Sequence, residues 1–202
     1  YKIMKKRILT VILLALMLLS ACGEDTPVET PEPTGTILAQ GDNFTVTENH
    51  TSGVTKYSYT ITDNAGNVLE SAICAKQPRV AEINDDLLGV RFYVNDKTFC
   101  RYYDLKNGRV SESFFNAFWD NGKLVAYHDY DNGHRMTVRD MFDENGYFYE
   151  RTLDVQALSI TVTACEQDEE TGELHVTYTY GDTGTEYEIT LPTKPAEAEG
   201  AE

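Results

Sequence analysis

Basic residues are scarce in this chain. Its 202 residues include 17 Lys and Arg against 33 Asp and Glu, which gives a net charge of −16 at pH 7. Such an acidic surface repels the phosphate backbone of nucleic acids and the anionic head groups of lipids. We therefore expect no nucleic-acid partner and no attachment to membranes through surface charge.

Catalytic signatures are also missing. The sequence has no G-x-S-x-G, S-x-x-K or H-E-x-x-H motif and no Gly-rich phosphate loop, the patterns that place a nucleophile, a base, a metal ligand or a phosphate. We predict no catalytic residue and favour a non-enzymatic role. The enzyme alternative is a hydrolase of envelope glycan or peptide that uses Asp or Glu. Glycan hydrolysis would require two carboxylates about 5 to 10 Å apart.

Cysteine is rare as well. Beyond Cys22, the chain contains Cys74, Cys100 and Cys165. No pair has the C-x-x-C spacing typical of zinc fingers, and an odd number leaves at least one thiol outside any intramolecular disulfide. Each of the three lies in an apolar segment of β character, so we expect small buried side chains. Their disulfide state stays open at this point.

Long apolar runs are absent, and the longest one is at the beginning. Lys5, Lys6 and Arg7 precede an apolar run over residues 8–19. This run is too short for a membrane span, which needs about 20 apolar residues. Cations, a short apolar core and small residues after it predict an export signal over residues 1–21.

The end of this signal, Leu19-Ser20-Ala21-Cys22, resembles the lipobox of bacterial lipoproteins. The resemblance implies that Cys22 becomes the first residue of the mature protein and carries a diacylglycerol, the only covalent group that we predict. Two or more acyl chains give stable anchoring. The expected location is the outer face of the cell membrane, or the outer membrane in an organism that has two.

Two polar segments flank the remaining sequence. Residues 22–40 are rich in Glu, Asp, Thr and Pro, a composition that predicts an extended, disordered tether. Residues 192–202 have a similar acidic character and are predicted to be a disordered tail. The region between them, residues 41–191, is long enough for one domain with its own core.

Apolar and polar residues alternate with a period of two through this domain, as expected for half-buried strands. Asn-Gly and Asp-containing turns separate the runs and favour hairpins. We predict an all-β, antiparallel meander of about four sheet units. The predicted strands are residues 55–62, 67–72, 87–94, 98–104, 109–112, 124–130, 134–142, 147–153, 158–165, 173–180 and 185–191.

Some of these turns look like copies of one another. Residues 103–112 match residues 142–150, and residues 61–66 are a looser copy upstream, so the spacing is near 40 residues. A repeat of this length built from strands is typical of β-propeller blades. The turn resembles those of propeller-like exported lipoproteins and of other β-repeat families. The alternative architecture is a β-sandwich.

The hairpin around His128 is the best cluster for metal chemistry. If the Asn-Gly pair at 132–133 forms a two-residue turn, Asp131 faces His134 and Asp129 faces Met136 on one side of the ladder. Asp129, Asp131 and His134 would then be the candidate ligands for calcium or a transition ion. The complete calcium-loop motif is absent, so a solvated hairpin tip is the favoured interpretation, and we predict no metal cofactor.

Aromatic residues supply the candidate ligand-binding surface. Trp119 ends a run of four aromatic residues within 114–119, and Tyr127 and Tyr130 follow on the next predicted strand. Aromatic anchors dominate recognition surfaces, so these three could form a platform for sugar or peptide. The competing interpretation is that the run fills the core between adjacent sheets.

The sequence also has two acidic clusters, at Asp85-Asp86 and at Asp168-Glu169-Glu170. Both are read as soluble loop tips. Taken together, the sequence predicts a lipid-anchored cell-envelope protein that binds an envelope polymer or another envelope protein. A purely structural envelope subunit is the third hypothesis.

Overall fold

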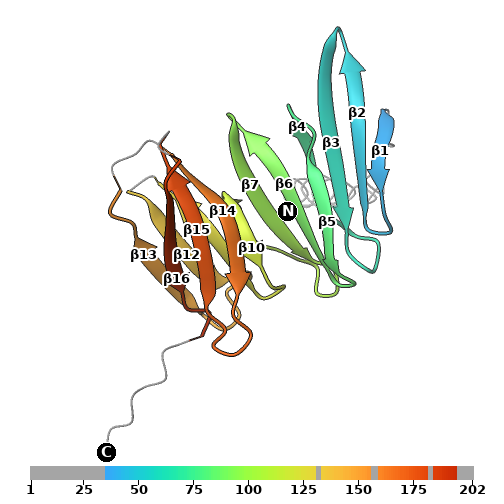
Figure 1. Cartoon of the computed structure of the whole chain (residues 1–202). Coiled ribbons are helices and arrows are strands. Elements are labelled where there is room, and N and C mark those ends of the chain that lie inside the picture. Colours follow the sequence, from blue (N-terminus) through green and yellow to red (C-terminus); the bar gives the residue numbers. More distant parts are fainter. Residues whose placement is uncertain (1–34, 131–132, 156–158, 182–183, 195–202) are drawn as a thin grey trace, which may run out of the picture. The chain divides into compact units, whose positions relative to one another are not determined.

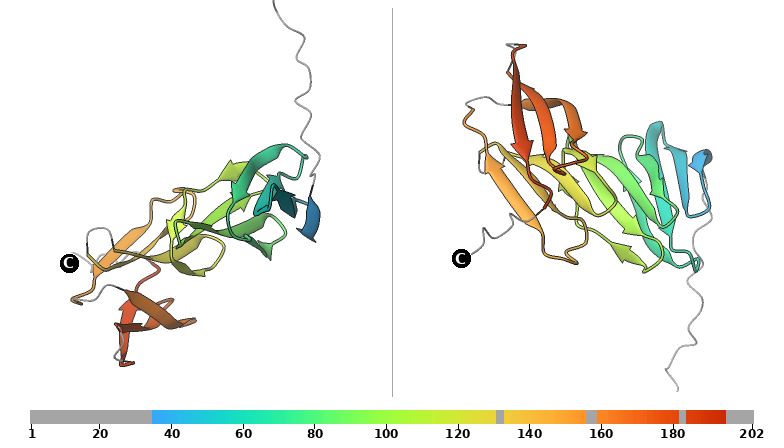
Figure 2. Two further views of the ribbon diagram at one scale, coloured as in Figure 1. Left: turned by 90° about the horizontal axis from the view of Figure 1, so that it is seen from above. Right: turned by 60° about the horizontal axis from the view of Figure 1, so that its bottom comes forward.

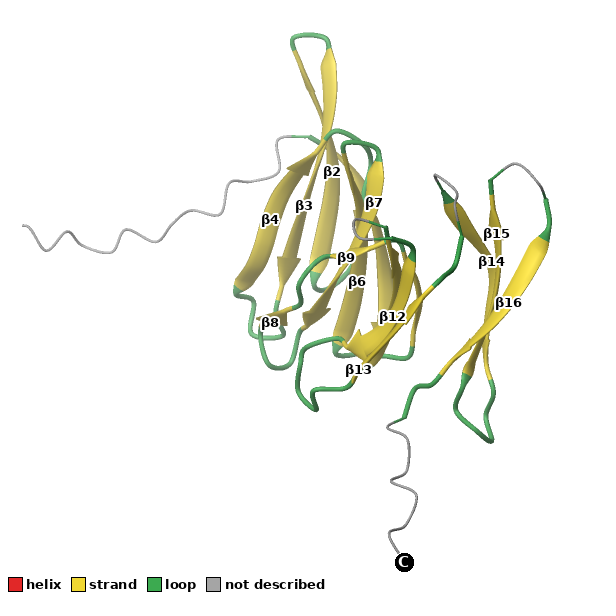
Figure 3. Ribbon diagram, turned by 90° about the vertical axis from the view of Figure 1, so that its left-hand side faces the viewer, coloured by secondary structure: helices red, strands yellow, loops and turns green. Residues whose placement is uncertain are grey.

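The computed structural model of the protein describes residues 35–130, 133–155, 159–181 and 184–194. The described residues form strands, turns and loops and contain no helix (Figure 3). Accordingly, none of these residues belongs to a helix long and apolar enough to cross a bilayer. The all-β class is confirmed. The predicted export signal, Cys22 and most of the tether and tail lie outside the described residues.

Sixteen strands make four sheets in chain order (Figure 1). The first sheet contains β1 (Thr36–Gln40), β2 (Phe44–Thr51), β3 (Val54–Thr62) and β4 (Val68–Cys74). The second contains β5 (Arg79–Asn84), β6 (Leu87–Val94), β7 (Lys97–Asp104) and β8 (Arg109–Val110), with β9 (Phe114–Phe115) also paired to β7. The third contains β10 (Ala117–Asp120), β11 (Leu124–Asp129), β12 (Arg135–Asp140) and β13 (Phe148–Thr152). The fourth contains β14 (Ile160–Gln167), β15 (Leu174–Tyr180) and β16 (Glu186–Leu191).

Successive strands pair antiparallel within each sheet, as Figure 2 shows for the orange to red strands β14–β16. The predicted antiparallel meander is therefore confirmed. Four sheets in sequence also favour it over the β-sandwich, which has two. The propeller arrangement stays a prediction. A propeller places its blades around a central channel, whereas the hydrophobic clusters of the described residues join only consecutive sheets.

The predicted domain boundaries need two corrections. Strand β1 occupies Thr36–Gln40, inside the segment that was assigned to the tether. All five of its residues are exposed, so it lacks the buried alternation that marks a strand in sequence. At the other end, Thr193 is buried and the Tyr147 hydroxyl donates to the Pro192 carbonyl at 2.7 Å. The folded domain thus extends into the segment that was predicted to be a disordered tail.

Three hydrophobic clusters lie between consecutive sheets. The alternating pattern places one face of each strand in these clusters, where each large apolar side chain contributes about 1.5 to 3 kcal/mol. The clusters contain, between the first and second sheets, Val46, Tyr59, Leu88 and Tyr103; between the second and third, Tyr102, Phe114, Val125 and Met141; and between the third and fourth, Val138, Leu174 and Leu191.

The repeated turn predicted from sequence is present in the first three sheets, always between the third and fourth strands. In each copy an aspartate at the end of the third strand, or directly after it, has a carboxylate that accepts a backbone N–H of the turn: Asp63, Asp104 and Asp140. A glycine with positive φ then precedes the next strand. The third copy is anchored by Asp140, and the predicted match with Asp143 is wrong because this turn is two residues longer than the second.

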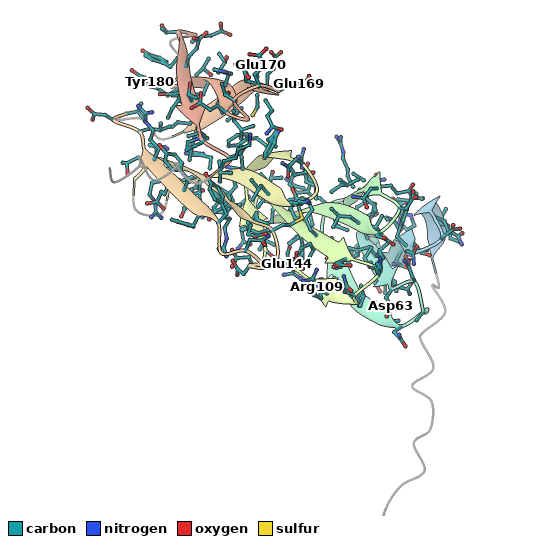
Figure 4. The ribbon with its side chains drawn as sticks, turned by 90° about the horizontal axis from the view of Figure 1, so that it is seen from below. Asp63, Arg109, Glu144, Glu169, Glu170 and Tyr180 are labelled. Atoms are coloured by element: carbon teal, nitrogen blue, oxygen red, sulfur yellow. The ribbon has the colours of Figure 1, made fainter. Side chains whose placement is uncertain are left out.

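Neighbouring copies of this turn contact one another. The Asn64 amide donates to the Leu105 carbonyl at 2.9 Å, which joins the first copy to the second. Arg109 then forms ion pairs with Asp104 in its own turn and with Glu144 in the third. Asp63, Arg109 and Glu144 follow one another along one edge in Figure 4. The repeated turns thus connect the first sheet to the second through a hydrogen bond and the second sheet to the third through an ion pair.

Candidate functional site

A groove with a volume of about 350 Å³ lies between the second sheet and β10. This volume is within the range of small-ligand sites. Strands β5, β6 and β7 supply one wall and β10 supplies the other. The side chains that give the groove its chemical character are Arg79, Arg91, Cys100, Tyr102, Trp119 and Asp120.

The wall from the second sheet depends on strand register. Arg79 pairs directly with Arg91 across β5 and β6, so both cations stand on the same face of the sheet. Gly89 is two residues before Arg91 and therefore on the same face of β6. It pairs with Tyr102 across β6 and β7 and lines the groove. A Cβ at this glycine would approach Tyr102 Cε1 to 3.4 Å and Ile83 Cδ1 to 3.3 Å. The lack of a side chain here keeps the groove open.

The wall from β10 depends on a β-bulge. The register between β10 and β11 shifts between Ala117 and Trp119, so Trp119 pairs with Ala126. A bulge changes the direction of the side chains that follow it. Trp119 is half-buried, packs against the hydrophobic cluster between the third and fourth sheets, and also lines the groove. Trp119 therefore contacts the core and also lines a groove, and its role in ligand binding stays a prediction.

Asp120 is the carboxylate of the groove. It is half-buried, and the Tyr102 hydroxyl donates to its Oδ2 at 3.2 Å. Burial raises the pKa of Asp120 above its ordinary value, and burial likewise raises the pKa of the Tyr102 phenol. A carboxyl and a phenol that hold their protons more firmly than usual can exchange hydrogen bonds with ligand hydroxyls.

The arginines of the groove differ from four of the five others in the described part of the chain; the fifth, Arg151, is exposed and also forms no ion pair there. Arg101, Arg109, Arg135 and Arg139 each form at least one ion pair with a carboxylate. In contrast, neither arginine of the groove has a carboxylate within ion-pair distance among the described residues. Arg91 donates only to the Ala117 carbonyl, at 3.3 Å.

Tyr127 and Tyr130, the other predicted ligand-binding residues, lie away from the Trp119 groove. Tyr127 packs against Phe114 with ring centroids 5.5 Å apart, and it lines a second groove of about 210 Å³ together with Asp129. Tyr130 meets the edge of Phe115 at 4.9 Å. The structure therefore does not bring the three aromatic residues into one platform.

The register assumed for the candidate metal ligands is wrong. Asp129 pairs with Arg135 rather than with Met136, and the two form an ion pair at 2.8 Å. A shift of one residue moves a side chain to the opposite face, so His134 turns away from Asp129. Asp131 lies outside the described residues. Within the described part of the chain, no three or more His, Cys, Asp or Glu side chains are grouped to hold a metal ion.

Sequence reasoning missed the partner of His134, which is His128. Both imidazoles are buried and stacked, with His128 Nε2 and His134 Nδ1 separated by 3.1 Å. Burial, and then the neighbouring His134, lower the pKa of His128 to about 4. The alternation of the strand could have revealed this burial. His128 pairs with Met136 across the ladder, so it lies on the same face of the sheet as this buried side chain.

The remaining candidates have structural roles. Asp168 accepts hydrogen bonds from the amides of Glu170 and Thr171, and Glu169 and Glu170 are exposed at the β14–β15 turn (Figure 4). Asp85 and Asp86 are exposed as well, and Asp86 accepts a hydrogen bond from Asn64. Both acidic clusters are therefore soluble tips, as predicted.

The three cysteines are free. Cys74 and Cys100 are buried, as predicted, whereas Cys165 is only half-buried. Burial raises the pKa of all three thiols. Cys100 lines the groove but is therefore held in its thiol form.

Comparisons with known proteins add no family to this description. The chain matches no protein-family model, and a search of curated proteins finds no relative. Two cations, aromatic rings and a carboxyl whose pKa is raised by burial are suited to holding a polar ring with negative charge.

Proposed function

We propose that the protein is a lipid-anchored, non-enzymatic binding module of the cell envelope. The lipobox-like sequence at Cys22 supplies the anchor, and the polar segment after it holds the all-β domain clear of the membrane surface. The domain faces the outside of the cell membrane, or resides in the outer membrane if the organism has two. Its partner is a polymer of the envelope.

The observation that supports binding most strongly is the groove at Trp119. It combines a half-buried indole with two cations that have no carboxylate partner among the described residues, on a chain with a large excess of acid. Stability alone does not favour such an arrangement, because like charges directly opposite one another in a sheet repel. A ligand with complementary negative charge would offset this repulsion, which supports a role of the groove in binding.

The same groove favours binding over hydrolysis. Hydrolysis of a glycoside uses two carboxyl groups on either side of the scissile bond. Asp120 is the single carboxylate among the described residues that line the groove. A structural envelope subunit is the weaker alternative, since a subunit of that kind needs no open groove.

Filling the groove should abolish retention on the envelope polymer. Ala81 is exposed and lines the groove, so Ala81→Phe should obstruct it without entering the core. We expect the full-length protein in detergent to co-sediment with purified insoluble envelope polymer, and the Ala81→Phe variant to stay in the supernatant. Ala75→Phe, at an exposed site outside the groove, is the matched control.

Equal sedimentation of the wild-type protein and both variants would assign retention to another surface. Failure of the wild-type protein to sediment would remove the proposed polymer partner. Thermal melting of both variants shows whether the added ring has disturbed the fold.

A further inference from the structure

We infer that the Trp119 groove binds a sugar residue that carries a carboxylate, so that the ligand is an acidic glycan. The inference rests on the proposed function, because it names the ligand class of the same groove. It is carried by the arrangement of Arg79, Arg91, Trp119 and Asp120.

The two arginines form a site for an anion. Direct pairing across β5 and β6 places their side chains side by side on one face, where like charges repel. Asp120, the carboxyl of the same groove, forms no ion pair with either arginine, although burial, which raises the pKa of Asp120, is partly offset by the charge of Arg91. A carboxylate between the two guanidinium groups would relieve this repulsion, and the planar guanidinium matches the two oxygens of a carboxylate.

The chain's overall charge makes this site a local exception. With 33 acidic and 17 basic residues, most of the protein opposes the approach of an anion. An anionic ligand would therefore be attracted at the groove and repelled elsewhere. This contrast gives selectivity that a generally basic surface would lack.

The rest of the groove fits a sugar ring. The half-buried faces of Trp119 and Phe118 provide an apolar surface for the C–H groups of a pyranose. The Tyr102 hydroxyl and the Asp120 carboxyl, already hydrogen-bonded to each other, can extend their hydrogen bonds to sugar hydroxyls. A simple inorganic anion would use the arginines and leave these groups without a role.

Trp119 is the single tryptophan of the chain, so its fluorescence reports directly on the groove. We expect trigalacturonate to produce a saturable change in the fluorescence of the full-length protein in detergent. The fully methyl-esterified trisaccharide, which has the same rings without the charges, should bind at least about tenfold more weakly, the change expected for loss of one charge-assisted hydrogen bond. Arg79→Gln and Arg91→Gln should each weaken trigalacturonate binding by a similar factor.

Arg151→Gln is the matched control for charge. Arg151 is exposed on β13 and lies outside the groove, so this variant should keep the wild-type affinity for trigalacturonate. Thermal melts of all three variants should lie no lower than that of the wild-type protein, because Arg79 and Arg91 are exposed as well and loss of either charge relieves their repulsion.

The other outcomes separate the inference from the proposed function. Equal affinity for the acid and its ester, or tighter binding of benzoate than of trigalacturonate, would overturn the acidic-sugar inference. An absence of any fluorescence change would overturn it too, while groove-dependent co-sedimentation with envelope polymer would leave the binding module standing. Failure of the wild-type protein to co-sediment with the envelope polymer would instead contradict the proposed function.

Discussion

Replacing Glu70 with leucine should lower the free energy of unfolding by about 3 kcal/mol, because it leaves a partly buried arginine without its counter-ion. Glu70, on β4 of the first sheet, accepts hydrogen bonds from Arg101 Nη1 at 2.8 and 2.7 Å and from the Tyr103 hydroxyl at 2.7 Å. Arg101 and Tyr103 belong to β7 of the second sheet. The side chain of Glu70 is only 18% exposed.

The environment of Glu70 explains the size of this effect. Burial alone would raise the pKa of Glu70, but the hydrogen bonds from Tyr103 and Arg101 outweigh it and lower the pKa below its ordinary value. The charged form is therefore the one that the fold stabilises. Tyr59 adds a third donor, at 2.9 Å, from β3. This network is the main polar connection that we find between the first two sheets.

Urea unfolding at pH 7 measures the loss. Asp96→Asn is the control, because Asp96 pairs with Lys76 in an ion pair whose side chains are largely exposed, and such pairs contribute little. A midpoint for Glu70→Leu that matches the wild-type midpoint would mean that the network does not hold the sheets together.

Acidification from pH 7 to about pH 4 should cost the fold about 3 kcal/mol through His128 alone. The pKa of His128 is about 4 in the folded protein and about 6.5 in an unfolded chain. Between these two values the unfolded state binds more protons than the folded state. The contribution of His128 to stability is therefore complete above pH 6.5 and declines as the pH falls toward 4.

Urea midpoints measured between pH 4 and pH 7 test this expectation. The His128→Gln variant lacks the buried imidazole, so its stability should fall less steeply over this range than that of the wild-type protein. His50, which is exposed and pairs with Thr55, provides the control: His50→Gln should follow the wild-type curve. Parallel curves for the wild-type protein and His128→Gln would contradict the assignment of the acid sensitivity to the buried pair.

The sequence predicted strands whose apolar and aromatic side chains stand out and are bounded by turn residues. Strand β6, Leu87–Val94, was predicted with its observed bounds, and most later strands agree to within two residues. Strands β1 and β5 were missed because their residues are exposed or only half-buried. Strand β2 was missed as well, although Val46 and Thr47 are buried in it.

The candidate site was only partly accessible to sequence reasoning. Trp119 could be identified from composition, since it is the single tryptophan of an aromatic run. The pairing of Arg79 with Arg91 could not, because it depends on the register of β5, a strand that was not predicted. The contact between the second sheet and β10 is a tertiary feature and has no local signal. The His128–His134 pair was hidden by a register error of one residue.

The most direct test of the lipid anchor is the mass of the mature protein's N-terminal peptide, isolated from the membrane fraction of the native organism. The account predicts a peptide that begins at Cys22 and carries a diacylglycerol, and it predicts that Cys22→Ser removes this modification. A mature protein that retains residues before Cys22 and carries no lipid would contradict the account.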